Sequence, residues 1–188
     1  MSQGAIEVEV KFESHTLAAM RVRLIELGAL LTQSRHLERN ILFDNDDGAL
    51  TEQRMVLRLR SALDNWLTLK TPLPDEDDQH KVRAELETRI EDFDVMYAIL
   101  SVLGFDDVWR YEKYRESFQI DDVICSLDHT PIGDFVELEG APAALRPLAE
   151  RLGFDWSTRN LHSYRQLFKT RALPSQHDML FDERSSAA

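Results

Sequence analysis

The stretch from Ile6 to Phe12 alternates apolar and charged residues without a break, and this alternation constrains the fold more than any other feature. Successive side chains of a β-strand point to opposite faces. The strand therefore has one apolar face, formed by Ile6, Val8, Val10 and Phe12, and one charged face, formed by Glu7, Glu9 and Lys11. A lone strand of this kind usually belongs to a sheet with one face in water. Its charged face indicates a site only if the rest of the chain repeats the pattern.

The same alternation recurs along the chain and predicts a sheet with an unusual charge distribution. Eight strands are predicted, at 5–12, 36–44, 54–61, 65–70, 81–90, 109–119, 122–128 and 134–139. Six of them carry one apolar and one densely charged face. The cations gather on some strands and the anions on others, whereas a solvated face usually mixes charge with Ser, Thr and Gln. This segregation favours a closed or nearly closed eight-stranded antiparallel β-barrel whose opposite charges meet across a tunnel-like lumen.

Helices are predicted to pack on the apolar outer faces of this barrel, which makes the fold class α+β. They are expected at about 15–27, 92–103, 142–152 and 158–170. Ser14 is the expected N-cap of the first helix. The first three helices each end in a Leu-Gly pair, and glycine is a common residue just beyond a helix C-terminus.

Length and charge limit the class of protein. The 188 residues fit one domain, expected over 1–173, with 174–188 as a tail that either frays or docks on the barrel. A formal net charge of −12 argues against nucleic acid and anionic membranes as partners, because both need a basic face. No apolar run approaches the roughly 20 residues of a membrane helix, and we see no secretion signal. A single cysteine, Cys125, cannot form an internal disulfide, so a cytoplasmic location is expected.

Two kinds of residue are expected to pack in the outer shell. One is Cys125, which lies on the apolar face of its predicted strand. The other is the three tryptophans, Trp66, Trp109 and Trp156, for which outer packing is favoured over stacking on a ligand.

Short charged motifs follow one another in order along residues 5–170. They are Glu7-Val8-Glu9-Val10-Lys11, Arg39 before Leu42-Phe43-Asp44, Val56-Leu57-Arg58-Leu59-Arg60, Lys70, Glu85-Leu86-Glu87, Lys113-Tyr114-Arg115, Asp128, and Gly133 to Glu139, with Ser163-Tyr164 in the last helix. This series resembles the CYTH domain, also called the triphosphate tunnel metalloenzymes. That family includes class IV adenylyl cyclases, thiamine triphosphatases and inorganic triphosphatases.

The resemblance implies a role for each matching residue. Phosphate oxygens would be bound by Lys11, Arg39, Arg58, Arg60, Lys70, Lys113 and Arg115. Mg²⁺ or Mn²⁺ would be held by Glu7, Glu9, Asp128, Glu137 and Glu139. Glu85 and Glu87 would support the acidic side, and Tyr164 either caps the tunnel or only packs beside Leu167. Catalysis would rest on Glu7, Glu9 and Lys11, with a carboxylate orienting the attacking water.

The resemblance favours a metal-dependent hydrolase of a small-molecule triphosphate, inorganic or organic. The paired Arg58 and Arg60 and the paired Glu85 and Glu87 look like the phosphohydrolase branch. A class IV adenylyl cyclase, which converts ATP to cyclic AMP and pyrophosphate, is the alternative. A binder of triphosphate or polyphosphate without catalysis is a third hypothesis. The resemblance also implies a possible homodimer.

Overall fold

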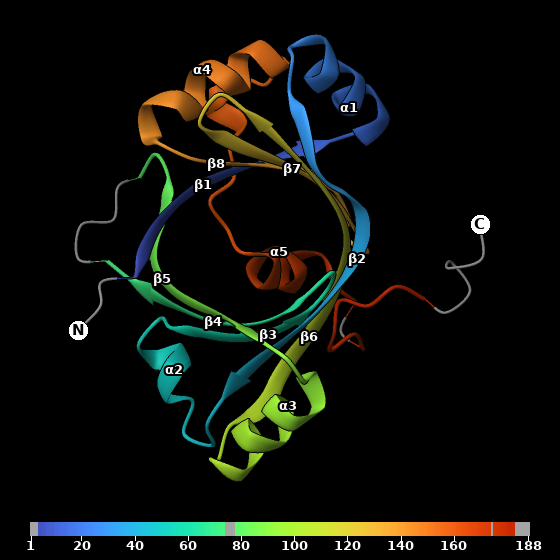
Figure 1. Ribbon diagram of the computed structural model, residues 1–188. Coiled ribbons are helices and arrows are strands. Elements are labelled where there is room, and N and C mark those ends of the chain that lie inside the picture. The colour runs from blue at the N-terminus through green and yellow to red at the C-terminus, as the bar shows by residue number, and fades with distance from the viewer. Residues whose placement is uncertain (1–3, 74–77, 174, 183–188) are drawn as a thin grey trace.

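Eight antiparallel strands close into a barrel, as the sequence predicted (Figure 1). The computed structural model describes residues 4–73, 78–173 and 175–182. The strands are β1 (Ala5–Ser14), β2 (Leu30–Asp44), β3 (Val56–Ser61), β4 (Asn65–Pro72), β5 (Lys81–Ile90), β6 (Asp106–Ile120), β7 (Val123–Thr130) and β8 (Gly133–Glu139). Around the ring their order is β1-β5-β4-β3-β2-β6-β7-β8, and β8 pairs with β1 to complete the ring.

Strands β2 and β6 extend beyond their predicted bounds. Each has 15 residues, and they pair with each other along most of that length, from Leu30↔Gln119 to Asp44↔Asp106. The first six residues of β2 are exposed, and the register with β6 shifts twice there. Regular alternation is absent from this segment because neither of its faces is buried, so the sequence pattern missed it.

Helices α1 and α4 lie outside the barrel on one side and α2 and α3 on the opposite side, whereas α5 is seen through the ring (Figure 1). Their bounds are α1 (Leu17–Glu26), α2 (Ala49–Glu52), α3 (Phe93–Val102), α4 (Pro142–Leu152) and α5 (Tyr164–Arg171), with a 3-10 turn at Trp156–Thr158. Within the described residues, no helix has both the length and the apolar character needed to cross a membrane.

Two helix boundaries differ from the predictions. The N-cap of α1 is Thr16, whose hydroxyl accepts a hydrogen bond from the Ala19 amide at 3.2 Å, while Ser14 is still the last residue of β1. The helix predicted at 158–170 is divided, because Asn160 forms backbone hydrogen bonds with Lys11 in both directions, at 2.7 and 3.1 Å. The chain is therefore extended at that point, and α5 starts only after the Ser163 cap.

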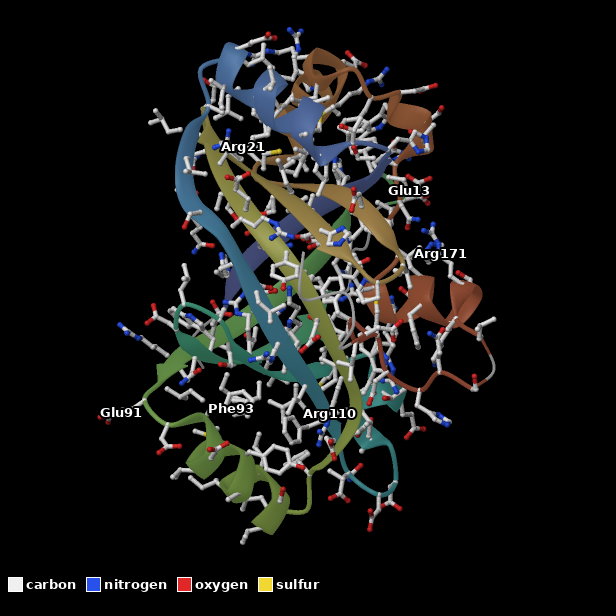
Figure 2. The ribbon with its side chains drawn as sticks, turned by 90° about the vertical axis from the view of Figure 1, so that its right-hand side faces the viewer. Glu13, Arg21, Glu91, Phe93, Arg110 and Arg171 are labelled. Atoms are coloured by element: carbon white, nitrogen blue, oxygen red, sulfur yellow. The ribbon has the colours of Figure 1, made fainter. Side chains whose placement is uncertain are left out.

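The apolar faces of the strands point outward and form the core together with the helices. One cluster joins Val10, Phe12 and Leu138 of the barrel to Leu24 of α1 and Leu148 of α4. A second joins β2 and β3 to α3, and Figure 2 shows Phe93 at the start of that helix. The arrangement is the reverse of a small barrel filled with apolar side chains, because charged side chains form most of the lumen lining.

Cys125 lies in the first of these clusters and is fully buried. Burial raises the pKa of its thiol to about 12. Because the thiolate is the nucleophile, we expect iodoacetamide to leave Cys125 unmodified in the folded protein at pH 8 and to modify it fully in urea. Mass spectrometry of the intact chain measures this, and rapid alkylation under native conditions would contradict it.

The tail docks on the barrel. Strand β7 pairs with β6 only from Tyr114 to Ile120, and beyond that point Met179 takes its place beside β6. The Met179 amide donates to the Arg110 carbonyl at 3.0 Å, and the Glu112 amide donates to the Met179 carbonyl at 2.8 Å. The Met179 side chain is fully buried beside Tyr164 and Phe168 of α5. The segment 175–182 therefore completes the wall next to α5.

Removing the Met179 side chain is expected to destabilise the fold. Met179→Ala should lower the free energy of unfolding by about 2–3 kcal/mol, since a fully buried side chain leaves a cavity. The neighbouring Leu180 is 44% exposed, so Leu180→Ala should cost less than about 1 kcal/mol. Urea unfolding of both variants tests this, and equal effects would mean that the tail is not docked in solution.

Candidate functional site

The charged faces of the strands meet in a cavity of about 580 Å³ inside the barrel. Its lysine and arginine side chains are Lys11, Arg54, Arg58, Arg60, Lys70, Lys81, Arg83, Lys113, Arg115 and Arg165. Its acidic side chains are Glu7, Glu9, Glu85, Glu87, Glu137 and Glu139. Strand alternation places the strand residues among them there, because every second residue of a closed barrel points inward. The structure therefore brings together twelve of the predicted site residues, and Tyr164 of α5 also lines the cavity.

Arg58 and Arg60 of β3 form the part of the cavity best suited to an anion. Both guanidinium groups lie near Glu87, at 3.8 and 3.6 Å, and Arg58 also donates to the Thr68 hydroxyl at 3.4 Å. The Nε atom of each is buried and has no hydrogen-bond partner among the described residues. A buried donor without a partner costs free energy, so these two side chains retain capacity for a ligand oxygen.

Glu7 and Glu9 of β1 lie close together but differ in protonation. Burial and the nearby Glu9 carboxylate raise the pKa of Glu7 to about 8, although Lys70 donates to it at 2.7 Å. Burial also acts on Glu9, but the ammonium groups of Lys81, at 2.5 Å, and Lys11 outweigh it and lower its pKa to about 2. At neutral pH Glu9 is therefore charged, while Glu7 retains a proton for much of the time.

Glu137 and Glu139 of β8 complete the acidic wall. Glu137 accepts from Lys11 at 2.6 Å and pairs with Arg115, and these cations hold its pKa well below the usual range despite burial. Burial and the charge of Glu9 raise the pKa of Glu139. Carboxylate crowding of this kind is relieved by a cation, and carboxylate oxygens are the ligands that Mg²⁺ and Mn²⁺ prefer.

The described residues contain no ready-made cage of three or more His, Cys, Asp or Glu side chains for a metal ion. Instead, lysines occupy the positions next to the carboxylates. Lys70 contacts both Glu7 and Glu85, and Lys81 contacts Glu9. The donor set of Glu7, Glu9, Glu137 and Glu139 thus fits a hard cation chemically, provided that the ammonium groups move toward another anion when the metal binds.

Asp128 differs from its expected place. It is fully buried and does not line the cavity. Its two carboxylate oxygens accept hydrogen bonds from Lys113 at 3.0 Å, from Arg115 at 2.7 and 2.5 Å, and from the Tyr164 hydroxyl at 2.7 Å. Because these donors already surround both oxygens, the contacts indicate a residue that positions the two cations and Tyr164 rather than a metal ligand.

Tyr164 connects α5 to Asp128 and to two lysines of the barrel wall. Besides its hydrogen bond to Asp128, its ring lies 4.4 Å from the Lys11 ammonium and 5.2 Å from that of Lys113. Arg171 at the other end of α5 pairs with Glu13 at the end of β1, and Figure 2 shows these two side chains facing each other. Helix α5, seen through the ring in Figure 1, is therefore held at one end of the barrel lumen.

The structure does not bring Arg39 to the cavity with the other residues predicted to bind phosphate. Its side chain is 69% exposed on the outer face of β2, where it donates to Glu112 at 3.1 Å. The inward residues of this part of β2 are Glu38, Asn40 and Leu42, as their pairing with Lys113, Tyr111 and Trp109 shows. Arg39 was predicted as a site residue because it precedes the Leu42-Phe43-Asp44 motif. Alternation along β2 directs its side chain away from the lumen.

The sequence analysis missed several lumen residues. Glu38 is buried, with its carboxylate 3.6 Å from Lys113 and 3.8 Å from Arg60, and these cations hold its pKa well below the usual range despite burial. Lys81 and Arg83 follow the same alternation as Glu85 and could have been found from it. Trp109 lines the cavity instead of packing outside, because it is the register partner of Leu42. Trp156 does pack in the outer cluster with Phe12.

A closed barrel with acidic and basic residues facing each other across its lumen defines a tunnel-type β-barrel protein whose site lies inside the barrel. The model of the CYTH domain matches residues 5–145. The chain therefore belongs to the CYTH family.

Known relatives agree with this assignment. A curated relative from Methanocaldococcus jannaschii, named "putative adenylate cyclase", is 33% identical over 136 residues, which cover 71% of this chain and 76% of that protein. A solved structure of a "putative adenylate cyclase" from Vibrio parahaemolyticus superposes with a TM-score of 0.79 at 20% identity, over 89% of this chain and 99% of that one. A Hippeastrum protein described as having a dominant triphosphatase activity has a TM-score of 0.60 at 19% identity, over 92% and 99% of the two chains. At these identities the two solved structures show the shared fold.

Proposed function

We propose that this chain is a divalent-metal-dependent phosphohydrolase that binds a triphosphate in the barrel lumen. The observation that carries the proposal is the pair of buried guanidinium groups, Arg58 and Arg60, whose Nε atoms lack partners among the described residues and face the acidic wall across the cavity. A triphosphate carries about four negative charges, and charge-assisted hydrogen bonds from arginine and lysine are the strongest that a protein offers to phosphate.

The basic residues would bind and orient the substrate. Arg58 and Arg60 of β3 lie next to Lys70 of the neighbouring strand β4, while Lys113 and Arg115 come from β6 and Lys11 from β1. Phosphoryl transfer requires mainly positioning and neutralisation of charge. When Mg²⁺ or Mn²⁺ is bound, it would supply further charge neutralisation next to the carboxylates of Glu7, Glu9, Glu137 and Glu139.

The two glutamates of β1 would have different roles, one in binding a cation and the other in accepting a proton. Glu9, with a pKa of about 2, stays charged and suits a cation. Glu7, with a pKa of about 8, lies near the range in which a carboxylate accepts a proton at neutral pH. In the fraction of molecules in which Glu7 is deprotonated, water would attack the terminal phosphorus and pass a proton to Glu7, while the bond to the bridging oxygen breaks. Orthophosphate and the diphosphate portion of the substrate are the products.

A class IV adenylyl cyclase remains the second candidate, and the name of the Methanocaldococcus jannaschii relative favours it. The same basic residues would then hold ATP while its ribose 3′-hydroxyl attacks the α-phosphate and pyrophosphate leaves. The hydrolase is placed first because the paired Arg58 and Arg60 and the paired Glu85 and Glu87 resemble the phosphohydrolase branch of the family.

A substrate panel separates these reactions. The purified protein is incubated with inorganic triphosphate, ATP and thiamine triphosphate under Mg²⁺ and under Mn²⁺, and both orthophosphate and cyclic AMP are measured. We expect orthophosphate to be released from at least one substrate. Cyclic AMP without orthophosphate would establish the cyclase instead, and binding without turnover of any substrate would establish a binder.

A further inference from the structure

One buried threonine joins a cation and an anion of the cavity wall. Thr68 of β4 is the register partner of Arg58 on β3 and of Glu87 on β5. The three residues therefore form one row across adjacent strands, and side chains opposite each other in such a row are about 5 Å apart at Cβ. Thr68 is completely buried and does not line the cavity, whereas Arg58 and Glu87 both do. Any effect of Thr68 on a ligand in the lumen therefore acts through these two charged residues.

The Thr68 hydroxyl has a hydrogen-bond partner on each side. It donates to the Glu87 carboxylate at 2.6 Å and accepts from the Arg58 guanidinium at 3.4 Å. The first bond is short, as expected when the acceptor is charged. The second is long and uses one Nη atom of Arg58, whose Nε has no hydrogen-bond partner among the described residues. The hydroxyl therefore directs the guanidinium group without using up its donors.

The position of this hydroxyl is fixed more firmly than those of its partners. Threonine is β-branched, so few χ1 rotamers are favourable. Arg58 and Glu87 have long side chains, and ordering a long side chain costs conformational entropy. The contacts with Thr68 impose part of this order when the protein folds, before a ligand arrives. Groups that are ordered in advance bind a ligand more tightly, because less freedom is lost on binding.

The hydroxyl holds both members of an ion pair. The Glu87 carboxylate lies 3.8 Å from the Arg58 guanidinium, and the Glu87 side chain is 31% exposed, so burial alone does not fix it. We propose that Thr68 is a positioning residue, whose hydroxyl holds Arg58 and Glu87 in the arrangement that receives the phosphates of a ligand. This inference rests on the proposed binding of a triphosphate in the lumen, and it adds a residue that acts on the site without contacting the ligand.

Replacing the hydroxyl tests the inference by equilibrium binding. Thr68→Val removes the hydroxyl and keeps the shape of the side chain. The probe is inorganic triphosphate, measured by calorimetry in metal-free buffer. We expect the dissociation constant to rise about 3- to 10-fold, which corresponds to the loss of one ordinary hydrogen bond. Thr68→Ala should show at least the same loss, while Thr68→Ser keeps the hydroxyl and should stay within about twofold of the wild type. Wild-type affinity in Thr68→Val, or an equal loss in Thr68→Ser, would overturn the inference.

Thr71 supplies the matched control. It lies three residues from Thr68 on β4, so its side chain points to the opposite face of the strand. Thr71→Val makes the same chemical change outside the row of Thr68, and it should leave the affinity within about twofold of the wild type. Equal losses in Thr68→Val and Thr71→Val would mean that the substitution disturbs β4 in general, which would contradict a specific role of the Thr68 hydroxyl.

A double-mutant cycle shows whether Thr68 acts through Arg58. In the Arg58→Gln background, Thr68→Val should change the affinity by less than about twofold, because the guanidinium group that the hydroxyl directs is gone. A general loss of structure would instead weaken binding by the same factor in both backgrounds. Equal factors would therefore reject the positioning role.

The same measurements separate this inference from the proposed function. If Arg58→Gln binds inorganic triphosphate as tightly as the wild type, or if the wild type does not bind it, the triphosphate site itself is wrong. If Arg58→Gln weakens binding and Thr68→Val does not, the triphosphate site is supported and only the role of Thr68 is wrong.

Discussion

Arg58→Gln is expected to lower kcat/KM for a triphosphate about 100- to 1,000-fold, which is the usual loss when one donor to a developing charge is removed from a preorganised site. Arg58 faces the lumen, and its Nε has no partner among the described residues. Glutamine retains a polar side chain but loses the charge and the forked geometry of the guanidinium group. Steady-state release of orthophosphate at saturating Mg²⁺ or Mn²⁺ measures the effect.

Arg39 supplies the matched control for this experiment. It is an arginine of the neighbouring strand, but it points to the outer face and pairs with Glu112. Arg39→Gln should therefore leave kcat/KM within about twofold of the wild type, since substitutions at exposed positions usually have small effects. Equal losses in the two variants would show that charge alone, and not position in the lumen, governs activity.

The barrel could be predicted because the pattern that indicates it lies within the sequence of individual strands. Six of the eight predicted strands have one apolar and one charged face, and the segregation of cations from anions indicated that the charged faces meet. The length of β2 could not be predicted, because Leu30 to Arg35 pair with β6 without burying either face. Helix α5 was placed too early, because the backbone pairing of Asn160 with Lys11 joins segments about 150 residues apart.

In the candidate site, too, the sequence predicted what depends on alternation within one strand, but not what depends on contacts between distant segments. Alternation alone brings Glu7, Glu9 and Lys11 to one face, and the structure adds that Glu7 contacts Lys70 and that Glu9 contacts Lys81. Motif position misplaced Arg39, although alternation of β2 would have corrected it. The surroundings of Asp128 depend on Tyr164 of α5, whose position no local pattern determines.

The ion pairs of the lumen also explain how the barrel folds around so many charges. Buried charges are costly unless paired, and several acidic residues of the motifs form ion pairs, such as Glu137 with Lys11 and Glu85 with Lys70. These pairs hold the barrel together without a ligand. A triphosphate with its metal ion would offer the lysines phosphate oxygens in exchange for carboxylates.

Among the buried ion pairs of the lumen, those of Asp128 should cost the most stability when they are removed. Asp128→Ala is expected to lower the free energy of unfolding by about 3–5 kcal/mol, since breaking a buried pair leaves uncompensated charge, here on Lys113 and Arg115. Asp128→Asn keeps the volume and should show a smaller loss in the same direction. Urea unfolding measures both. Glu150 pairs with Arg146 on the exposed face of α4, so Glu150→Ala should change stability by less than about 1 kcal/mol.

Metal binding distinguishes the two roles open to Asp128. If it positions Lys113, Arg115 and Tyr164, Asp128→Asn should raise KM for a triphosphate because the two cations lose their common partner. The Asp128→Asn variant should bind Mn²⁺ with an affinity within about threefold of the wild type, as measured by calorimetry. Glu9→Gln should weaken Mn²⁺ binding at least tenfold, because a charged oxygen ligand is lost. A loss of Mn²⁺ affinity in Asp128→Asn as large as that in Glu9→Gln would show that Asp128 is a metal ligand after all, and that its contacts with the two cations give way when metal binds.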